Sequence, residues 1–176
     1  MLALARLAIE EAILHGRIVN NLPSEGAFAG RRGVFVTLHV AGKLRGCIGV
    51  VEGLEPLGEG IARCAASAAL EDPRFPSLKK EELQDLSIEI SLLSPLAPIR
   101  PEEIAIGRHG LYIAQGSHRG LLLPQVATEH HLDREQFLAE TSRKAGLPRE
   151  AWREPETVIS GFTCEILSDQ DRPPGS

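Results

Sequence analysis

A thiol, a guanidinium and two glycines lie side by side in the hexapeptide 44–49, which reads Leu-Arg-Gly-Cys-Ile-Gly. Cysteine acts as a nucleophile or a metal ligand only as the thiolate, and a fixed positive charge nearby lowers the thiol pKa from its free value of about 8.5. Arg45 could supply that charge, so the pair Arg45 and Cys47 predicts a catalytic site. The alternative is that Cys47 is a small buried hydrophobic side chain, as most free cysteines are.

The two glycines of the hexapeptide give a second indication of a site. Glycine weakens a strand interior and is typical of a β-bulge or of a place where a ligand or another backbone approaches closely. Gly46 and Gly49 are therefore candidate ligand- or partner-binding positions, although simple packing against a helix would explain them as well.

The other cysteines and the histidines carry no comparable signal. Cys64 falls among alanines in a helical pattern and Cys164 falls within a strand pattern, so both are predicted to be core. None of the six histidines shows a ligand spacing with a carboxylate or a cysteine on a shared face. Because no glycine-rich phosphate loop or other cofactor motif occurs either, we expect no metal and no cofactor.

The hexapeptide lies on the second strand of a predicted β-hairpin. Residues 34–40 are almost all β-formers, Ala41-Gly42 interrupts them, and residues 44–51 resume the pattern. Two residues of this kind between two strand patterns predict a tight hairpin turn. The hairpin then delivers Cys47 onto the second strand.

The register of that hairpin decides which side chains meet Cys47. With a two-residue turn, Cys47 pairs with Val36, Arg45 pairs with Leu38, and all four share one face of the sheet. His39 then points to the opposite face. A Cys47 and His39 dyad is therefore disfavoured, but a single β-bulge would reverse this conclusion.

The rest of the chain alternates helical and strand patterns around a proline-rich linker at residues 95–101. The pattern predicts one domain over 1–168, with halves 1–98 and 99–168, and a polar, frayed tail over 169–176. Apolar spacing predicts helices over 2–15, 56–70, 125–131 and 134–145, and strands over 87–93, 110–114, 119–123 and 158–167.

The two halves repeat the same order of parts. Each has a hairpin, an Arg-Gly pair that opens its second strand, a helix, and a strand that carries Glu-Ile. This order arises either from an internal duplication of a hairpin-helix-strand unit or from chance, since few residues are identical. In either case the class is α+β, with a mainly antiparallel sheet, flanking helices and two subdomains.

Composition narrows the functional classes. A net charge of −5 and an aromatic content of 4% disfavour nucleic-acid binding, which needs cations for phosphates and aromatic rings for bases. No apolar run approaches the roughly 20 residues that span a bilayer, so we expect no membrane segment. Three cysteines, without a C-x-x-C pair, predict reduced thiols and a cytoplasmic location.

Five segments in order resemble the AMMECR1-domain family over nearly the whole chain. The resemblance implies a two-part α+β fold in a cytosolic protein whose activity is not established. In microbes it also implies association with a Memo-like protein and a radical SAM protein. The segments are Gly-Val-Phe-Val-Thr-Leu at 33–38, the hexapeptide at 44–49, Asp-Pro-Arg-Phe-Pro at 72–76, Leu-Leu-Pro-Gln-Val-Ala at 122–127, and Lys-Ala-Gly-Leu at 144–147, which is followed by Trp152.

The resemblance adds weight to the hexapeptide as a functional surface and brings in three further candidates. Asp72 and Arg74, fixed between prolines, could form a charged pair at the rim of the site. They could equally form a helix-ending turn locked by its own salt bridge. Gln125, just beyond Pro124, is a candidate polar wall of the site if the halves are duplicated.

Two functional hypotheses remain open. In the first, the chain is an enzyme or modification factor in which Arg45 activates Cys47 for work on a small molecule or protein, together with the Memo-like and radical SAM partners. In the second, the chain is a non-catalytic binding module. Arg45 and Arg74 then recognise a partner protein or an anionic ligand, and Cys47 packs beneath them.

Overall fold

The structure, a computed structural model, describes residues 1–169 and divides into two compact units. The first unit holds Met1–Leu93 together with the chain from Glu165, and the second holds Ser94–Cys164. The predicted tail 169–176 falls outside the described residues from residue 170 on. Within the described part of the chain, no helix is long and apolar enough to cross a membrane.

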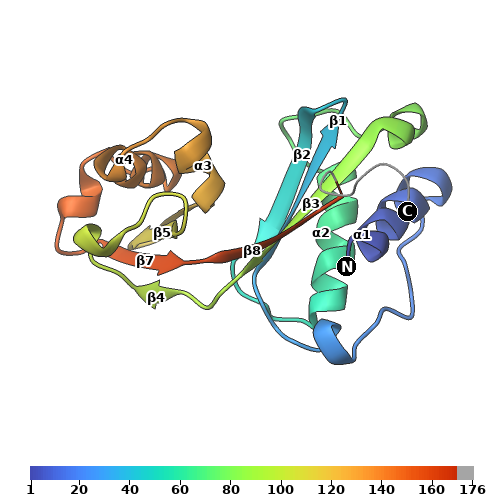
Figure 1. The fold of residues 1–176 in the computed structure, drawn as a ribbon, viewed down its shortest axis with the longest axis horizontal. Helices are drawn as coiled ribbons and strands as arrows, with labels where there is room; N and C mark the ends of the chain where they lie inside the picture. Colours follow the sequence, from blue (N-terminus) through green and yellow to red (C-terminus); the bar gives the residue numbers. More distant parts are fainter. Residues whose placement is uncertain (170–176) are drawn as a thin grey trace. The chain divides into compact units, whose positions relative to one another are not determined.

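A four-stranded sheet and two helices make up the first unit (Figure 1). Both helices pack on the same face of the sheet, where they bury an aliphatic core that includes Leu38 and Ile61. The strands, in the order β2-β1-β3-β8, are β1 (Val34–Val40), β2 (Lys43–Val50), β3 (Leu86–Leu93) and β8 (Cys164–Ser168), and the helices are α1 (Leu2–His15) and α2 (Leu57–Leu70).

The other face of this sheet carries no helix of the first unit, and we call it the helix-free face. On β1 the buried residues alternate with half-buried ones, so Thr37 points away from the core that Leu38 enters. This alternation is the period-2 pattern expected of a strand that packs on one side only. The helix-free face is the surface on which the row containing Cys47 lies.

The tight hairpin turn predicted at Ala41-Gly42 is confirmed. Val40 pairs with Lys43, and the two turn residues have φ angles of +48° and +75°. Two successive positive φ angles are those of a type I′ turn, whose twist matches that of the flanking strands.

Beyond the turn the predicted register is wrong, because the pairing shifts by one residue between Leu38 and His39. His39 pairs with Leu44 and Leu38 pairs with Gly46, so Arg45 is the extra residue of a β-bulge. From there on every residue of β2 faces the opposite side to that predicted. Cys47 consequently lies opposite Thr37 rather than Val36, on the same face as His39.

The second unit repeats this architecture with different residues. Its core is built around Leu111, Ile113, Phe137 and Leu138. The strands, in the order β4-β7-β5-β6, are β4 (Ala97–Pro98), β5 (Gly110–Gln115), β6 (His118–Leu122) and β7 (Val158–Phe162), and the helices are α3 (Pro124–Glu129) and α4 (Arg134–Lys144). Short 3₁₀ helices complete the two units at η1 (Gly26–Phe28), η2 (Lys80–Asp85), η3 (Pro101–Glu103) and η4 (Ala151–Arg153).

The two sheets have the same strand order, which supports the predicted repeat. In each, a hairpin pairs through its first strand with the strand that follows the helices, and a fourth strand lies beyond that one. The fourth strands are exchanged: β4 follows β3 in sequence but joins the second sheet, and β8 follows β7 but joins the first. The single strand predicted over 158–167 is therefore two strands in two sheets, and the units do not divide the chain into 1–98 and 99–168.

A glycine brings hairpin and helix into backbone contact in each unit. A Cβ on Gly46 would lie 2.1 Å from the carbonyl oxygen of Ala68 in α2, and one on Gly120 would lie 2.3 Å from the amide nitrogen of Ala145 at the end of α4. Real Cβ atoms do not approach backbone atoms so closely. The Arg-Gly pair shared by the two halves thus marks the same packing contact in both.

Candidate functional site

Cys47 is the end of a polar row that crosses three strands of the helix-free face. It pairs with Thr37 on β1, and Thr37 pairs in turn with Glu89 on β3. The Thr37 hydroxyl donates a hydrogen bond to Cys47 Sγ at 3.3 Å. Cross-strand partners in an antiparallel sheet lie about 5 Å apart, so the row is continuous.

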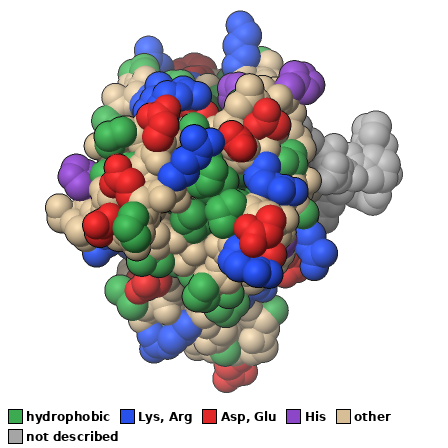
Figure 2. All heavy atoms as spheres, turned by 90° about the vertical axis from the view of Figure 1, so that its left-hand side faces the viewer, with side chains coloured by type: hydrophobic (Ala, Val, Ile, Leu, Met, Phe, Trp, Pro, Cys, Tyr) green, Lys and Arg blue, Asp and Glu red, His purple; other side chains and the backbone are tan. Residues whose placement is uncertain are grey.

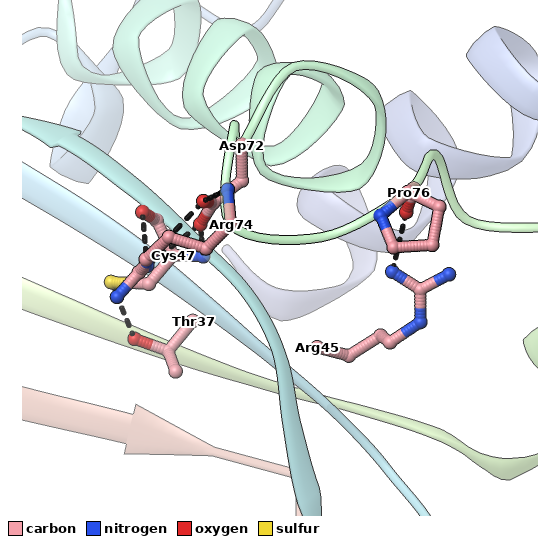
Figure 3. A network of polar contacts seen from close by, with 6 residues as sticks. All are labelled: Thr37, Arg45, Cys47, Asp72, Arg74 and Pro76. Atoms are coloured by element: carbon pink, nitrogen blue, oxygen red, sulfur yellow. Dashed lines mark hydrogen bonds and ion pairs between the residues drawn. The ribbon is translucent and has the colours of Figure 1, made fainter.

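The main chain of Cys47 is held on its outer side by the turn that follows α2 (Figure 3). β2 is an edge strand, so its outward amide and carbonyl have no neighbouring strand to pair with. Asp72 Oδ2 accepts a hydrogen bond from the Cys47 amide at 2.8 Å, and Arg74 Nη2 donates one to the Cys47 carbonyl at 3.3 Å. The two side chains thus take the place of a fifth strand at this one residue.

Asp72 and Arg74 are also bound firmly to each other. Arg74 Nε lies 3.0 Å from Asp72 Oδ1, Arg74 Nη2 lies 2.7 Å from Oδ2, and the Arg74 amide donates to Oδ1 at 3.0 Å. The Asp72 side chain is 2% exposed and that of Arg74 is 52% exposed. The pair therefore locks the turn by its own salt bridge, and it also places a guanidinium beside Cys47. Its role in a functional site stays a prediction.

Arg45 does not serve Cys47, contrary to the prediction. As the bulge residue it turns toward the loop before β3, where Nε and Nη2 bind the two carboxylate oxygens of Glu82 at 2.7 and 3.0 Å. Nη1 donates to the carbonyl of Pro76 at 2.6 Å, and the side chain is only 15% exposed. Arg45 thus links β2 to this loop. The guanidinium that affects the pKa of the Cys47 thiol is that of Arg74.

The thiol of Cys47 is not an activated thiolate in this arrangement. Burial raises its pKa above the ordinary value, and this effect outweighs the opposing effects of the Thr37 hydrogen bond and the Arg74 charge. The carboxylates of Asp72 and Glu89 raise the pKa further. We therefore expect Cys47 to be protonated at neutral pH, which corrects the prediction of a low-pKa cysteine.

The carboxyl of Asp72 behaves in the opposite way. Hydrogen bonds from Arg74 and from the Cys47 amide hold its pKa far below the usual range, although burial opposes them. It therefore remains an anion that accepts hydrogen bonds, rather than a general acid that gives up a proton near neutral pH. Glu82 is likewise held ionised, because the hydrogen bond from Arg45 lowers its pKa.

The remaining predicted positions have structural explanations of their own. The Ala68 carbonyl closes on Gly46, and a Cβ on Gly49 would lie 2.3 Å from the ring of Phe35. The chain itself thus supplies the close approach that each glycine predicts. Gln125 lies in α3 of the second unit, where its backbone carbonyl accepts a hydrogen bond from the Thr128 hydroxyl. It belongs to a different unit from Cys47, Asp72 and Arg74.

The other two cysteines differ from Cys47. Cys64 is fully buried in the core between α2 and the sheet, as predicted, and burial raises its pKa to about 11. Cys164, predicted to be core, is only half buried at the start of β8. Cys47 and Cys64 are free thiols. Among residues 1–169 no cluster of histidine, cysteine or acidic side chains could hold a metal ion.

Sequence reasoning missed Thr37 and Glu89, the two residues that share the row with Cys47. Thr37 is inside the predicted strand 34–40 and Glu89 inside the predicted strand 87–93, so both were within reach of a register argument. The missing information was the bulge at Arg45. Gly46 beside it was a signal for a bulge but did not fix its position.

These features define a class of protein. It has two α+β units with the same strand order, and one of the units carries a half-buried thiol in a polar row, beside an arginine held by a salt bridge. The family model described as AMMECR1 matches residues 2–167. The chain belongs to the AMMECR1 family.

Relatives of known sequence and structure agree with this assignment. A protein of Methanothermobacter thermautotrophicus is 44% identical, over 96% of this chain and 92% of its own length. One from Thermococcus gammatolerans is 43% identical, over 97% of this chain and 89% of its own length. The crystal structure of an uncharacterised protein from Pyrococcus horikoshii is similar with a TM-score of 0.90 and 40% identity, covering 99% of this chain and 92% of its own. No function is established for these relatives.

Proposed function

We propose that the chain is a binding module whose recognition surface is the helix-free face around Cys47, with Arg74 as the residue that meets a partner protein or an anionic ligand. The observation that carries this proposal is the double hold of Asp72 and Arg74 on the Cys47 main chain. It fixes a half-exposed guanidinium beside a protonated thiol. Preorganised groups of this kind favour binding, because less side-chain freedom is lost when the ligand arrives.

The partners that we propose are a Memo-like protein and a radical SAM protein, as the family resemblance implies. We also propose a cytoplasmic location, in keeping with three cysteines that include no C-x-x-C pair. Arg45 takes no part in recognition in this proposal, because Glu82 and the Pro76 carbonyl already occupy its guanidinium.

The test is capture of the full chain by a purified Memo-like protein and, separately, by a purified radical SAM protein. Arg74→Gln should weaken capture by tenfold or more, whereas Cys47→Ser should leave it within twofold. Arg63→Gln is the matched control, since Arg63 is a half-exposed arginine of the same unit that pairs with Glu55. Circular dichroism would show that each variant is folded. Equal capture of wild type and Arg74→Gln would overturn the proposal.

A second candidate function is favoured by the hydrogen bond from Thr37 to Cys47 Sγ. A hydroxyl that donates to sulfur stabilises the thiolate once it forms, and Glu89 at the far end of the row could accept the proton. In this candidate Cys47 is a nucleophile of an enzyme or modification factor, which becomes reactive when a substrate or partner changes its surroundings.

Alkylation of each cysteine, resolved by peptide mass across pH 5 to 10, separates the two candidates. The binding module predicts that Cys47 reacts slowly at pH 7 and that its rate is still rising at the alkaline end of this range, because the thiolate is the reactive form and the thiol pKa is raised. Rapid alkylation of Cys47 below pH 8, with Cys64 protected, would instead support the nucleophile. Repeating the measurement with each purified partner present would show whether binding changes the thiol.

A further inference from the structure

The second unit has a cleft of its own, between the end of β6, α3 and α4. Its volume is about 630 Å³, which is within the range of small-molecule sites. Figure 2 shows one face of the molecule, on which hydrophobic side chains gather at the centre with charged side chains around them. The cleft is lined by Leu122, Val126, His130, Leu132, Glu140, Arg143 and Lys144, all of them in the second unit.

The floor of the cleft is apolar and continuous with the core. Leu122, Val126 and Leu132 are partly buried and pack against the buried cluster around Phe137. An aliphatic or ring-shaped ligand placed on these three side chains would lose water from its surface and from theirs. Such burial favours binding by roughly fourfold for each methylene group.

The rim of the cleft carries an excess of positive charge. Glu140 is already paired with two arginines, since Arg143 Nη2 lies 2.7 Å from its carboxylate and Arg149 also binds it. The hydrogen bond from Arg143 lowers the Glu140 pKa, so this carboxylate stays ionised and engaged. The side chain of Lys144 has no hydrogen bond or ion pair with any residue in the described part of the chain. In a chain of net charge −5, the rim of the cleft is therefore a local site for an anion.

We propose that this cleft binds a small amphipathic anion, with the aliphatic body on Leu122, Val126 and Leu132 and the anionic head group at Lys144 and Arg143. Glu140 orients the Arg143 guanidinium through Nε and Nη2, at 2.9 and 2.7 Å. The imidazole of His130 lies at the same rim and can donate or accept a further hydrogen bond. This proposal is independent of the site at Cys47, because it uses residues of the second unit alone.

The experiment is a titration of the ¹⁵N-labelled full chain, followed by amide chemical shifts, with four probes. Hexanoate and hexyl phosphate carry both the body and the charge, hexanamide carries the body alone, and acetate carries the charge alone. Hexanoate or hexyl phosphate should cause saturable shifts at Leu122, Val126 and Lys144, and the tighter of the two identifies the preferred head group. Hexanamide and acetate should each bind at least tenfold more weakly.

Two variants test the cationic rim. Lys144→Glu should weaken binding of the tighter probe by tenfold or more, and Lys80→Glu, an exposed lysine of the first unit, should leave it unchanged. The proposal is overturned if neither charged probe gives saturable shifts, if hexanamide binds as tightly as hexanoate, or if Lys144→Glu binds as tightly as wild type. Unchanged amide shifts elsewhere would show that each variant keeps the fold.

Discussion

The same position in the two units carries different chemistry. In the first sheet the residue after the packing glycine is Cys47, and the row across the strands continues through Thr37 and Glu89. In the second sheet the residue after Gly120 begins a row of Leu121, Tyr112 and Ser160. The comparison separates what the fold needs from what a function needs. The glycine is common to both units, whereas the thiol, its hydroxyl donor and the carboxylate occur in one.

The edge of each sheet shows the same contrast. In the first unit Arg45 ties β2 to a separate loop, and Asp72 with Arg74 holds the edge at Cys47. In the second unit Arg119 donates to carbonyls of its own hairpin, at Gly116 and His118. The first hairpin is thus held through its Arg-Gly arginine, whereas the second is held through other side chains: Gln115 donates to Glu154 and Thr157, and His118 hydrogen-bonds the Ala145 carbonyl.

The largest effect is expected at the glycines that the units share. Gly46→Ala and Gly120→Ala should each lower the free energy of unfolding by about 3 kcal/mol, because the added Cβ overlaps helix backbone that must then shift. Urea unfolding followed by circular dichroism measures the whole chain. The fluorescence of Trp152 reports the second unit, since it is the single tryptophan.

Gly30→Ala is the control for this pair, because nothing lies within 4 Å of a Cβ at Gly30 and its φ angle is not positive. It should unfold at the wild-type urea concentration. If Gly46→Ala were as stable as this control, Gly46 and Gly120 would not have the same role in packing.

The next largest effect is expected at Asp72. Asp72→Asn should lower the free energy of unfolding by about 2 kcal/mol at pH 7, because the variant weakens charged hydrogen bonds to a buried group. The folded-state pKa is below the unfolded value of about 3.9, so the stabilisation is complete above that value and is lost as the pH falls toward the folded pKa. Urea unfolding at pH 7 and at pH 3 should show that the gap between wild type and variant narrows in acid.

Glu140→Gln supplies the counterpart in the second unit. Its carboxylate is also paired with arginines, but its side chain is 21% exposed, compared with 2% for Asp72, so the loss should be below about 1 kcal/mol. A gap that stayed constant from pH 7 to pH 3 for Asp72→Asn would contradict the assignment of a depressed carboxyl pKa.

A smaller difference is expected between the two Arg-Gly arginines. Arg45→Ala should lower the free energy of unfolding by about 1 to 2 kcal/mol, because Glu82 loses its partner. Arg119→Ala should cost less than about 0.5 kcal/mol, as is usual for exposed surface positions. Alkylation of Cys47 in the Arg45→Ala variant should follow the wild-type pH profile. A shift of that profile would show that Arg45 affects the pKa of the Cys47 thiol.

The smallest effect is expected at the hydroxyl of the row. The hydrogen bond from Thr37 to Cys47 Sγ lowers the thiol pKa, and Thr37→Val removes this bond. The midpoint of the alkylation profile should therefore rise by about half a pH unit. Thr128→Val, whose hydroxyl binds the Gln125 carbonyl in the second unit, is the matched control. A Thr37→Val profile identical to that of wild type would show that the Thr37 hydroxyl does not affect the pKa of the Cys47 thiol.

Much of the fold was predictable from local sequence. Periodic apolar positions placed α1 and the first hairpin, and Gly16 ends the helix with φ of +61° as its position suggested. The exchange of strands was not predictable, because residues 158–167 read as one strand and only Thr163 separates β7 from β8. Which sheet a strand joins is set by pairing with distant residues, and a local pattern holds no such information.

Part of the arrangement around Cys47 was predictable, while its use as a functional site stays a prediction. Cys47 and the Asp72 and Arg74 pair lie together as the sequence suggested, since helix-ending prolines fix the turn beside the hairpin. The role of Arg45 was wrong because one bulge reverses the face of every following residue. A bulge depends on how the whole edge is held, in this chain partly by Glu82, which lies far away in sequence.

The exchange of strands has a consequence for how the protein is made. The first sheet receives β8 only when residues 164–168 have left the ribosome, although its other three strands end at Leu93. During synthesis of the intervening chain, β3 is an unpaired edge that could recruit another nascent chain. Among the described strands, the last in sequence order is therefore the one that closes the first sheet, and a chain cut before Cys164 would leave that edge open.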